Sequence, residues 1–327
     1  MLTPIDFLND LFNPVLAFLP RALLMAVVCA VVCGVVGVHV VLRGMAFIGD
    51  AVAHSVFPGL AVAFLVGGSL VVGGMVAGVT TAVLVAMLSQ NRRLKEDSVI
   101  GVLFVGAFAL GVVVIARAPG YSGSLESFLF GSITGVPASD VPVAVGGGAL
   151  VLAVLALLHR PLTAVSLDRE TARAAGLPVL ALDVVLYVAV SVSVVIAVQT
   201  IGNVLVLALL VTPAATARLL TDRLTTMLWL APLLGSLTGV LGLYLSWSAD
   251  VPTGGTIVLV LTAGFVLAWV GAPRHGALAR MRARRRPEGG TSGAAAAASA
   301  HEEPEAADQG PAPAPAALPA AAGTAAQ

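Results

Sequence analysis

The sequence predicts an all-α, polytopic membrane protein, and three observations lead to that class. Hydrophobic residues make up 58% of the 327 residues, charged residues only 10%, and the mean hydropathy is +1.01. The surface of a water-soluble domain needs far more charge, so the composition excludes that class. The apolar residues also gather in long runs between short polar segments, and a helix of roughly 20 apolar residues crosses a ~30 Å hydrocarbon layer.

Nine runs are long enough to span a bilayer. Residues 1–14 before them contain acidic Asp6 and Asp10 but no basic residue, whereas a cleaved secretory signal starts with positive charge. We therefore expect the first run to be retained, in a transmembrane domain over residues 15–274. The expected spans are 21–42, 45–66, 70–89, 98–117, 141–159, 179–200, 203–220, 227–247 and 255–272.

Lysine and arginine predict the orientation, because cytoplasmic loops are rich in both. With nine crossings, most of them fall on the side of Arg43 and of the C-terminal basic stretch. We expect residues 1–14 to be a short extracytoplasmic segment and residues 275–327, basic and then rich in Ala and Pro, to be a disordered cytoplasmic tail. The net charge is zero, so nothing indicates nucleic acid as a partner.

Asp50 and His54 are the most informative residues of the second span. Ionisable side chains are costly in a bilayer and mark functional positions there. At helical pitch, residues four apart lie on one face, so the carboxylate and the imidazole meet at one point. Oxygen and nitrogen together suit divalent metal ions of borderline hardness. We therefore predict that Asp50 and His54 bind a metal ion.

Pro58 and Gly59 follow in the same span. The missing N–H of Pro58 leaves the carbonyl group of His54 without its helical partner, as a third potential ligand, and Gly59 lets the kinked backbone approach a neighbour. A structural alternative remains open. Gly49-Asp50 is also typical of a helix start, where Asp50 would only cap backbone N–H groups.

Other potential ligands have simpler explanations. Cys29 and Cys33 lie four apart in the first span; free cysteine behaves as a small hydrophobe, so we expect packing, with thiolate ligands as the alternative. We expect His39 to pack in the helix bundle or to extend toward the membrane surface.

The loop at residues 163–177, between the fifth and sixth spans, predicts one short helix over residues 166–176. Asp168 and Glu170 lie in its first turn, Gly176 supplies the C-terminal stop, and Pro178 follows. Such a short helix is marginal alone, and its small apolar and charged residues suit a groove on a cytoplasmic protein better than a lipid surface. We call residues 166–176 the docking segment; its key residues are Ser166, Leu167, Asp168, Glu170, Ala174 and Gly176.

Two enzyme classes are excluded by missing motifs. The only lysine, Lys95, does not follow a glycine-rich loop, so the chain has no phosphate-binding loop of an ATPase. The H-E-x-x-H motif of metalloproteases is absent as well. The sequence thus predicts a transport subunit without its own ATPase, not an enzyme.

Four segments together resemble one family. They are Val40–Arg43 with Phe47–Ala51, His54 and Pro58–Gly59; Asp97–Gly101; Asp168–Gly176; and Ile201–Arg218. In this order they resemble the permease subunits of manganese, zinc and iron ATP-binding-cassette (ABC) importers, the ABC-3 type metal permeases. The chain departs from the family pattern at three places. Gly44 stands where a second basic residue is common, His39 replaces an apolar residue, and the tail after Arg286 lies outside the pattern.

The resemblance implies a dimeric, multi-pass permease in the cytoplasmic membrane of a prokaryote, surrounded by lipid. It implies three protein partners: a cytoplasmic ABC ATPase that receives the docking segment, an extracytoplasmic metal-binding protein, and a second permease subunit. It also implies that Asp50 and His54 are pore-side ligands for a transported Mn, Zn or Fe ion, with no permanent cofactor. Small residues would permit close packing and a hinge, with ordinary packing as the alternative: Gly202, Pro213, Ala214 and Ala215.

Two other transport functions stay open. A permease for a chelated metal, such as a siderophore or cobalamin, needs a wide pore and would leave Asp50 and His54 without an ion to bind. A secondary transporter would work without ATP and use the two residues as a proton relay. A purely structural membrane anchor would explain neither the ionisable pair nor the capped loop.

Overall fold

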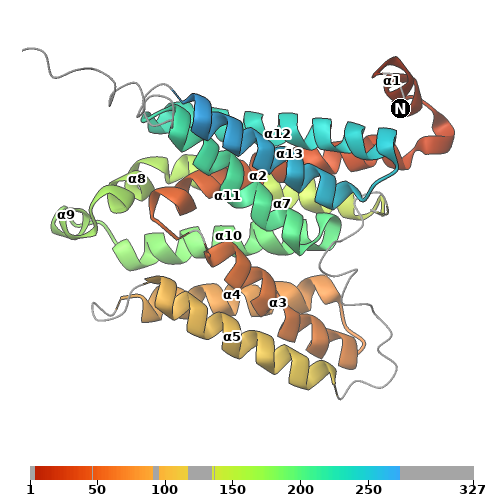
Figure 1. Cartoon of the computed structure of the whole chain (residues 1–327). Helices are drawn as coiled ribbons and strands as arrows, with labels where there is room; N and C mark the ends of the chain where they lie inside the picture. The colour runs from red at the N-terminus through yellow and green to blue at the C-terminus, as the bar shows by residue number, and fades with distance from the viewer. Residues whose placement is uncertain (1–3, 46, 91–95, 117–134, 136, 273–327) are drawn as a thin grey trace, which may run out of the picture. The chain divides into compact units, whose positions relative to one another are not determined.

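The computed structural model describes residues 4–45, 47–90, 96–116, 135 and 137–272, and every regular element within them is helical (Figure 1). Nine helices in this part of the chain are long and apolar enough to cross a membrane. The prediction of an all-α, multi-span protein is therefore confirmed. The predicted tail at 275–327 lies outside the described residues.

Each expected span corresponds to one helix, with every end within three residues of the prediction. Four short elements complete the described part: α1 (Pro4–Leu11) and the 3-10 turn η1 (Pro14–Leu16) before the first span, and α8 (His159–Leu167) and α9 (Arg169–Ala174) between the fifth and sixth. The spans are α2 (Phe18–Leu42), α3 (Ile48–Leu65), α4 (Leu70–Leu88), α5 (Glu96–Ile115), α7 (Asp140–Leu157), α10 (Val179–Ile201), α11 (Asn203–Leu220), α12 (Leu224–Ala249) and α13 (Thr253–Gly271).

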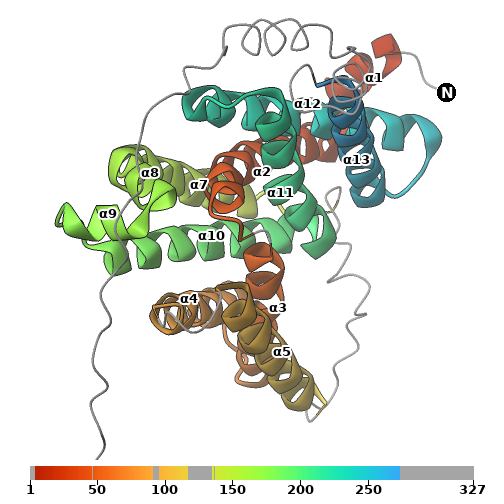
Figure 2. The ribbon, with the colours of Figure 1, turned by 60° about the vertical axis from the view of Figure 1, so that its left-hand side comes forward.

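The helices form two neighbouring groups. Helix α2 packs against α7, α10, α11 and α12, while α3 packs against α4 and α5, and α4 lies against α10 (Figure 2). Lipid tails are as apolar as leucine, so helices associate in a membrane through close packing at small residues. A side chain at Gly59 would clash with the Gly73 carbonyl oxygen, and one at Gly37 would clash with the Leu210 carbonyl oxygen. These glycines bring α3 to α4 and α2 to α11.

An elbow joins α2 to α3. Helix α2 ends at Leu42, Arg43 follows as its cap, and Gly44 takes a positive φ of 71° that favours glycine. The Met45 N–H then donates to the Val40 carbonyl group at 3.1 Å, which closes the helix end. Helix α3 therefore begins at Ile48, three residues after the expected start of the second span.

Gly202 separates α10 from α11. Its φ of 84° and ψ of 158° lie in a region that is essentially accessible to glycine alone. The chain therefore breaks here, and Asn203 becomes the first residue of α11. This break places the start of α11 beside α3.

Candidate metal site

Asp50 and His54 contact each other within α3. Phe47 is the N-cap of this helix, without a side-chain capping bond, so Asp50 lies in the first turn and His54 one turn later. The Nδ1 atom of His54 lies 3.3 Å from Oδ1 of Asp50 and 3.0 Å from its carbonyl oxygen. The side chains are 31% exposed for Asp50 and 19% for His54, so both stay accessible to a small ion. Asp50 is therefore not the N-cap of α3, and its carboxylate contacts His54.

Aromatic residues of α5 enclose the imidazole. The centroid of the His54 ring lies 5.0 Å from that of Phe104 and 5.4 Å from that of Phe108, with the ring planes nearly perpendicular. Such edge-to-face contacts are favourable between aromatic rings. They fix the direction of the His54 ring and keep one side of the site apolar.

Asn203 is a third member that sequence reasoning did not assign to the site. Its Nδ2 atom lies 3.4 Å from Nε2 and 3.5 Å from Nδ1 of His54. Nearly equal distances to both ring nitrogens place the amide beside the ring, not on the axis of one nitrogen, so this is a contact and not a strong hydrogen bond. Asn203 is only 3% exposed, and its Oδ1 atom finds no hydrogen-bond partner within the described part of the chain. In the sequence, the available signal was the polar Asn203 between the two apolar runs that form α10 and α11.

The three side chains offer a carboxylate oxygen, an imidazole nitrogen and an amide oxygen, all of which bind divalent metals. Among the described residues, no group of three or more His, Cys, Asp or Glu side chains could hold a metal ion. Asp50 and His54 thus supply two candidate ligands, and Asn203 contacts this pair through its amide nitrogen. An ion here would take further ligands from water or another chain.

Pro58 lies inside α3 without ending it. A side chain at Gly111 of α5 would meet the Pro58 nitrogen at 3.0 Å, so α5 packs directly against the proline. The missing N–H leaves the His54 carbonyl group without a helical donor, one turn before this contact.

The other predicted residues lie in packed helices. Pro213 and Ala214 are buried in α11, and Ala215 is half-buried. Cys29 and Cys33 are buried in α2, a location that suits packing.

The docking segment differs from the expected single helix. Thr163–Leu167 belongs to α8, and a second helix, α9, begins at Arg169. Asp168 has an extended backbone and is the N-cap of α9 instead of a first-turn residue; its carboxylate accepts the Glu170 N–H at 2.9 Å and the Thr171 hydroxyl group. These hydrogen bonds hold the pKa of Asp168 below its ordinary value. The competition of an N-cap side chain for backbone N–H groups explains the break.

The end of the docking segment matches its sequence. Gly176 takes a φ of 79°, its N–H donates to the Arg173 carbonyl group at 3.0 Å, and the Leu177 N–H donates to the Ala172 carbonyl group at 3.1 Å. This pattern terminates helices at glycine. Leu167 is 83% exposed, and Glu170 and Ala174 are also exposed, whereas Ala172 is buried. The segment therefore presents a small apolar and charged surface.

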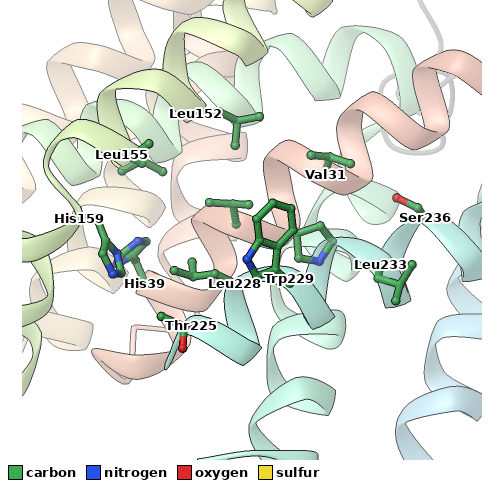
Figure 3. Close-up of a pocket in the computed structure, with 13 residues that line it drawn as sticks. Val31, His39, Leu152, Leu155, His159, Thr225, Leu228, Trp229, Leu233 and Ser236 are labelled. Carbon is green, nitrogen blue, oxygen red and sulfur yellow. The ribbon is translucent and has the colours of Figure 1, made fainter. Parts of the chain in front are cut away.

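A pocket of about 700 Å³ lies apart from the site, between α2, α7, α8 and α12 (Figure 3). His39 and His159 lie together at one end, with ring centroids 6.3 Å apart, and the remaining lining is mostly aliphatic with Trp229. His39 is buried, so it packs and does not reach the membrane surface. No Asp or Glu is among the described residues that line this pocket, so the two histidines lack the carboxylate that accompanies His54 on α3.

Comparison with known proteins identifies relatives over most of the chain. The family described as "ABC 3 transport family" matches residues 15–272. The chain is 42% identical over 273 residues to the manganese transport system membrane protein MntC of Halalkalibacterium halodurans, covering 83% of this chain and 94% of that protein. It is 35% identical over 272 residues to the chelated iron transport system membrane protein YfeC of Yersinia pestis, covering 82% and 92%.

A solved structure agrees with the fold. The structure of PsaBC from Streptococcus pneumoniae in complex with Fab is similar with a TM-score of 0.74 and 33% identity, covering 86% of this chain and 100% of that chain. Sequence and fold therefore agree over the same region. The chain belongs to the ABC 3 transport family, the ABC-3 type metal permeases that its motifs resemble.

Proposed function

We propose that this chain is the transmembrane permease subunit of an ABC importer that carries divalent metal ions, Mn, Zn or Fe, across the cytoplasmic membrane. The names of its relatives, a manganese and an iron transport protein, support a metal cargo. The observation that carries the proposal is the contact of Asp50 with His54 beside Asn203, in a helix long enough to span.

The chemistry of transfer follows from hydration. A divalent ion cannot enter hydrocarbon without its water shell, so the pathway must supply ligands that replace water and then release the ion. Asp50 would neutralise part of the charge, while His54 and Asn203 would add nitrogen and oxygen ligands. A second permease subunit related by a two-fold axis would double this set. The two oxygen donors suit manganese, although ligand type alone does not exclude zinc or ferrous iron.

The energy would come from a separate cytoplasmic ATPase, because this chain has no phosphate-binding loop. The docking segment, with exposed Leu167 and Ala174, suits a groove on that ATPase. An extracytoplasmic metal-binding protein would deliver the ion on the other side. No cofactor bound permanently to the chain is needed; the metal is the substrate.

A chelated metal is the second candidate cargo, and the name of YfeC favours it. The close contacts of Phe104 and Phe108 with His54 argue for a small, dehydrated ion instead. Uptake of free Mn²⁺ and of a ferric chelate, measured side by side, separates the two cargos.

The experiment is Mn²⁺ uptake into proteoliposomes that contain the permease, its ATPase and its metal-binding protein. We expect His54→Ala and Asp50→Asn each to lower uptake at least about tenfold, which corresponds to ~1.4 kcal/mol of lost interaction. His159→Ala and Asp140→Asn are matched controls outside the site and should transport like the unmodified chain. Undiminished Mn²⁺ uptake by both site variants would contradict the proposal.

A further inference from the structure

Asp183 forms a buried ionic cluster that the metal site does not include. It lies in α10 with no exposed side-chain surface. Its carboxylate accepts Nη1 of Arg43 at 2.6 Å, Nη2 of Arg169, and Nε2 of Gln90 at 3.2 Å. A buried charge is tolerated only when it is paired and hydrogen-bonded, so these partners are held firmly to Asp183. They come from the α2 elbow, from α9 and from the end of α4.

On one side, this cluster holds the docking segment. Arg169 is the first residue of α9, and Arg173 in its last turn donates to Oε1 of Gln90 at 2.7 Å. The Nε atom of Arg43 donates to the Ser166 hydroxyl group in α8 at 3.1 Å. Both short helices of the segment are therefore attached to the cluster through side chains.

On the other side, the cluster holds the elbow that leads into α3. Arg43 caps α2 and stands five residues before Ile48, where α3 begins. One turn along α10 from Asp183, the Tyr187 hydroxyl group contacts Sδ of Met45 at 3.2 Å. Helix α10 therefore holds the elbow at two points, Arg43 and Met45, immediately before the helix that carries Asp50 and His54.

The surroundings of Arg43 allow its side chain a second position. A cavity of about 140 Å³ lies between the α2 end and the α8–α9 junction, lined in part by Leu42, Arg43 and Ser166. The Nη2 atom of Arg43 is buried, and none of the residues that the structure describes forms a hydrogen bond with it. A charged donor left unsatisfied, next to free space, indicates that another position of this side chain is available.

We propose that Asp183 is a positioning residue through which displacement of the docking segment is transmitted to α3 and its metal ligands. The inference rests on the proposed function, in which an ATPase moves this segment. Because Arg169 and Arg43 share one carboxylate, a shift of α9 changes the position or pairing of Arg43, and with it the elbow. Asp183 contacts neither the metal nor ATP; it links the displacement of α9 to the displacement of the elbow that leads into α3.

The test compares ATP hydrolysis with Mn²⁺ taken up per ATP in the reconstituted complex of permease, ATPase and binding protein. We expect Asp183→Asn and Arg169→Ala to retain the ATPase subunit and its hydrolysis, while uptake per ATP falls at least about fivefold, the lower range of typical coupling between sites. Arg169→Lys keeps the charge and should restore the ratio. Asp140→Asn, the same change outside the cluster, should leave the ratio unaltered.

The outcomes separate the alternatives. If Asp183→Asn does not assemble, Arg169→Ala decides, because it leaves the Arg43–Asp183 pair in place. Loss of the ATPase subunit in Arg169→Ala, or an unchanged ratio in the assembled variants, overturns the inference, because the cluster is then a structural or docking feature. Absence of uptake of Mn²⁺, Zn²⁺ and Fe²⁺ alike by the unmodified complex overturns the proposed function and this inference with it, whereas normal uptake with unchanged variants overturns the inference alone.

Discussion

Asn203 lies against the imidazole of His54 through its amide nitrogen, and its buried amide oxygen has no hydrogen-bond partner among the described residues. Its neighbour Gly202 fixes this position, since the helix break there makes Asn203 the first residue of α11. An amide oxygen beside a carboxylate and an imidazole adds a neutral ligand, which strengthens binding without adding charge that would slow release.

Asn203→Ala should raise the Mn²⁺ concentration that gives half-maximal uptake roughly fivefold, because one ligand or hydrogen bond contributes about 1 kcal/mol. Asn203→Asp should lower that concentration and also lower the maximal rate, since a second carboxylate retains the ion longer. Uptake kinetics over a range of metal concentrations measure both. Identical kinetics of both variants and the unmodified chain would exclude Asn203 from the site.

Asp168 gives a prediction for the docking segment. Its hydrogen bonds lower its pKa in the folded chain below the ~3.9 of an unfolded Asp, so the cap is fully present above that pH and is lost as the pH falls through the folded pKa. Amide exchange in α9, corrected for its intrinsic pH dependence, should therefore show constant protection between about pH 5 and pH 8. Asp168→Ala should speed exchange there, and Asp168→Asn, which also caps helices, should not. If amide exchange in Asp168→Ala is as slow as in the unmodified chain, the cap does not stabilise α9.

At the scale of elements, glycines with a positive φ set where helices stop, among them Gly44 in the elbow, Gly176 after α9 and Gly202 between α10 and α11. The lengths of the spans were predictable because hydropathy and length are local properties of the chain. The break at Asp168 was not predictable, because it depends on whether one side chain caps a new helix. The start of α3 was displaced because the turn at Gly44 comes before it.

Gly202→Ala should destabilise the protein by about 1–3 kcal/mol, because alanine does not adopt this backbone conformation without strain. Gly101→Ala is the control: beyond the local backbone of α5, a Cβ atom at Gly101 would meet no described atom within 4 Å, and alanine favours helices over glycine. Thermal unfolding of the two variants in detergent compares them. A Gly202→Ala variant as stable as Gly101→Ala would show that the break does not need glycine.

At the scale of the whole molecule, function depends on contacts between residues far apart in sequence. The spacing of Asp50 and His54 could be predicted to bring them together because both lie on one helix. Asn203 lies 149 residues from His54, and Arg43 lies 140 residues from Asp183. Such pairs depend on which helices pack together, which no local pattern in this sequence specifies. The candidate site was therefore predicted in part, and the Asp183 cluster was not.

Orientation is also a property of the whole molecule. With nine crossings, we predict that the connection between α12 and α13 faces outside and that α9 faces the cytoplasm. A membrane-impermeant maleimide should label Val251→Cys in intact cells, and Thr171→Cys only after permeabilisation. The unmodified chain is the control, because Cys29 and Cys33 are buried and should not react. Labelling of Thr171→Cys from outside would invert the topology.

The most direct measurement of the central claim is the pulsed electron paramagnetic resonance spectrum of Mn²⁺ held by the reconstituted permease complex, without the binding protein. A metal ion bound by His54 should show coupling to an imidazole nitrogen that disappears in His54→Ala and remains in His159→Ala. A nitrogen coupling that is absent from the unmodified chain, or unchanged in His54→Ala, would show that the ion does not pass through this cluster.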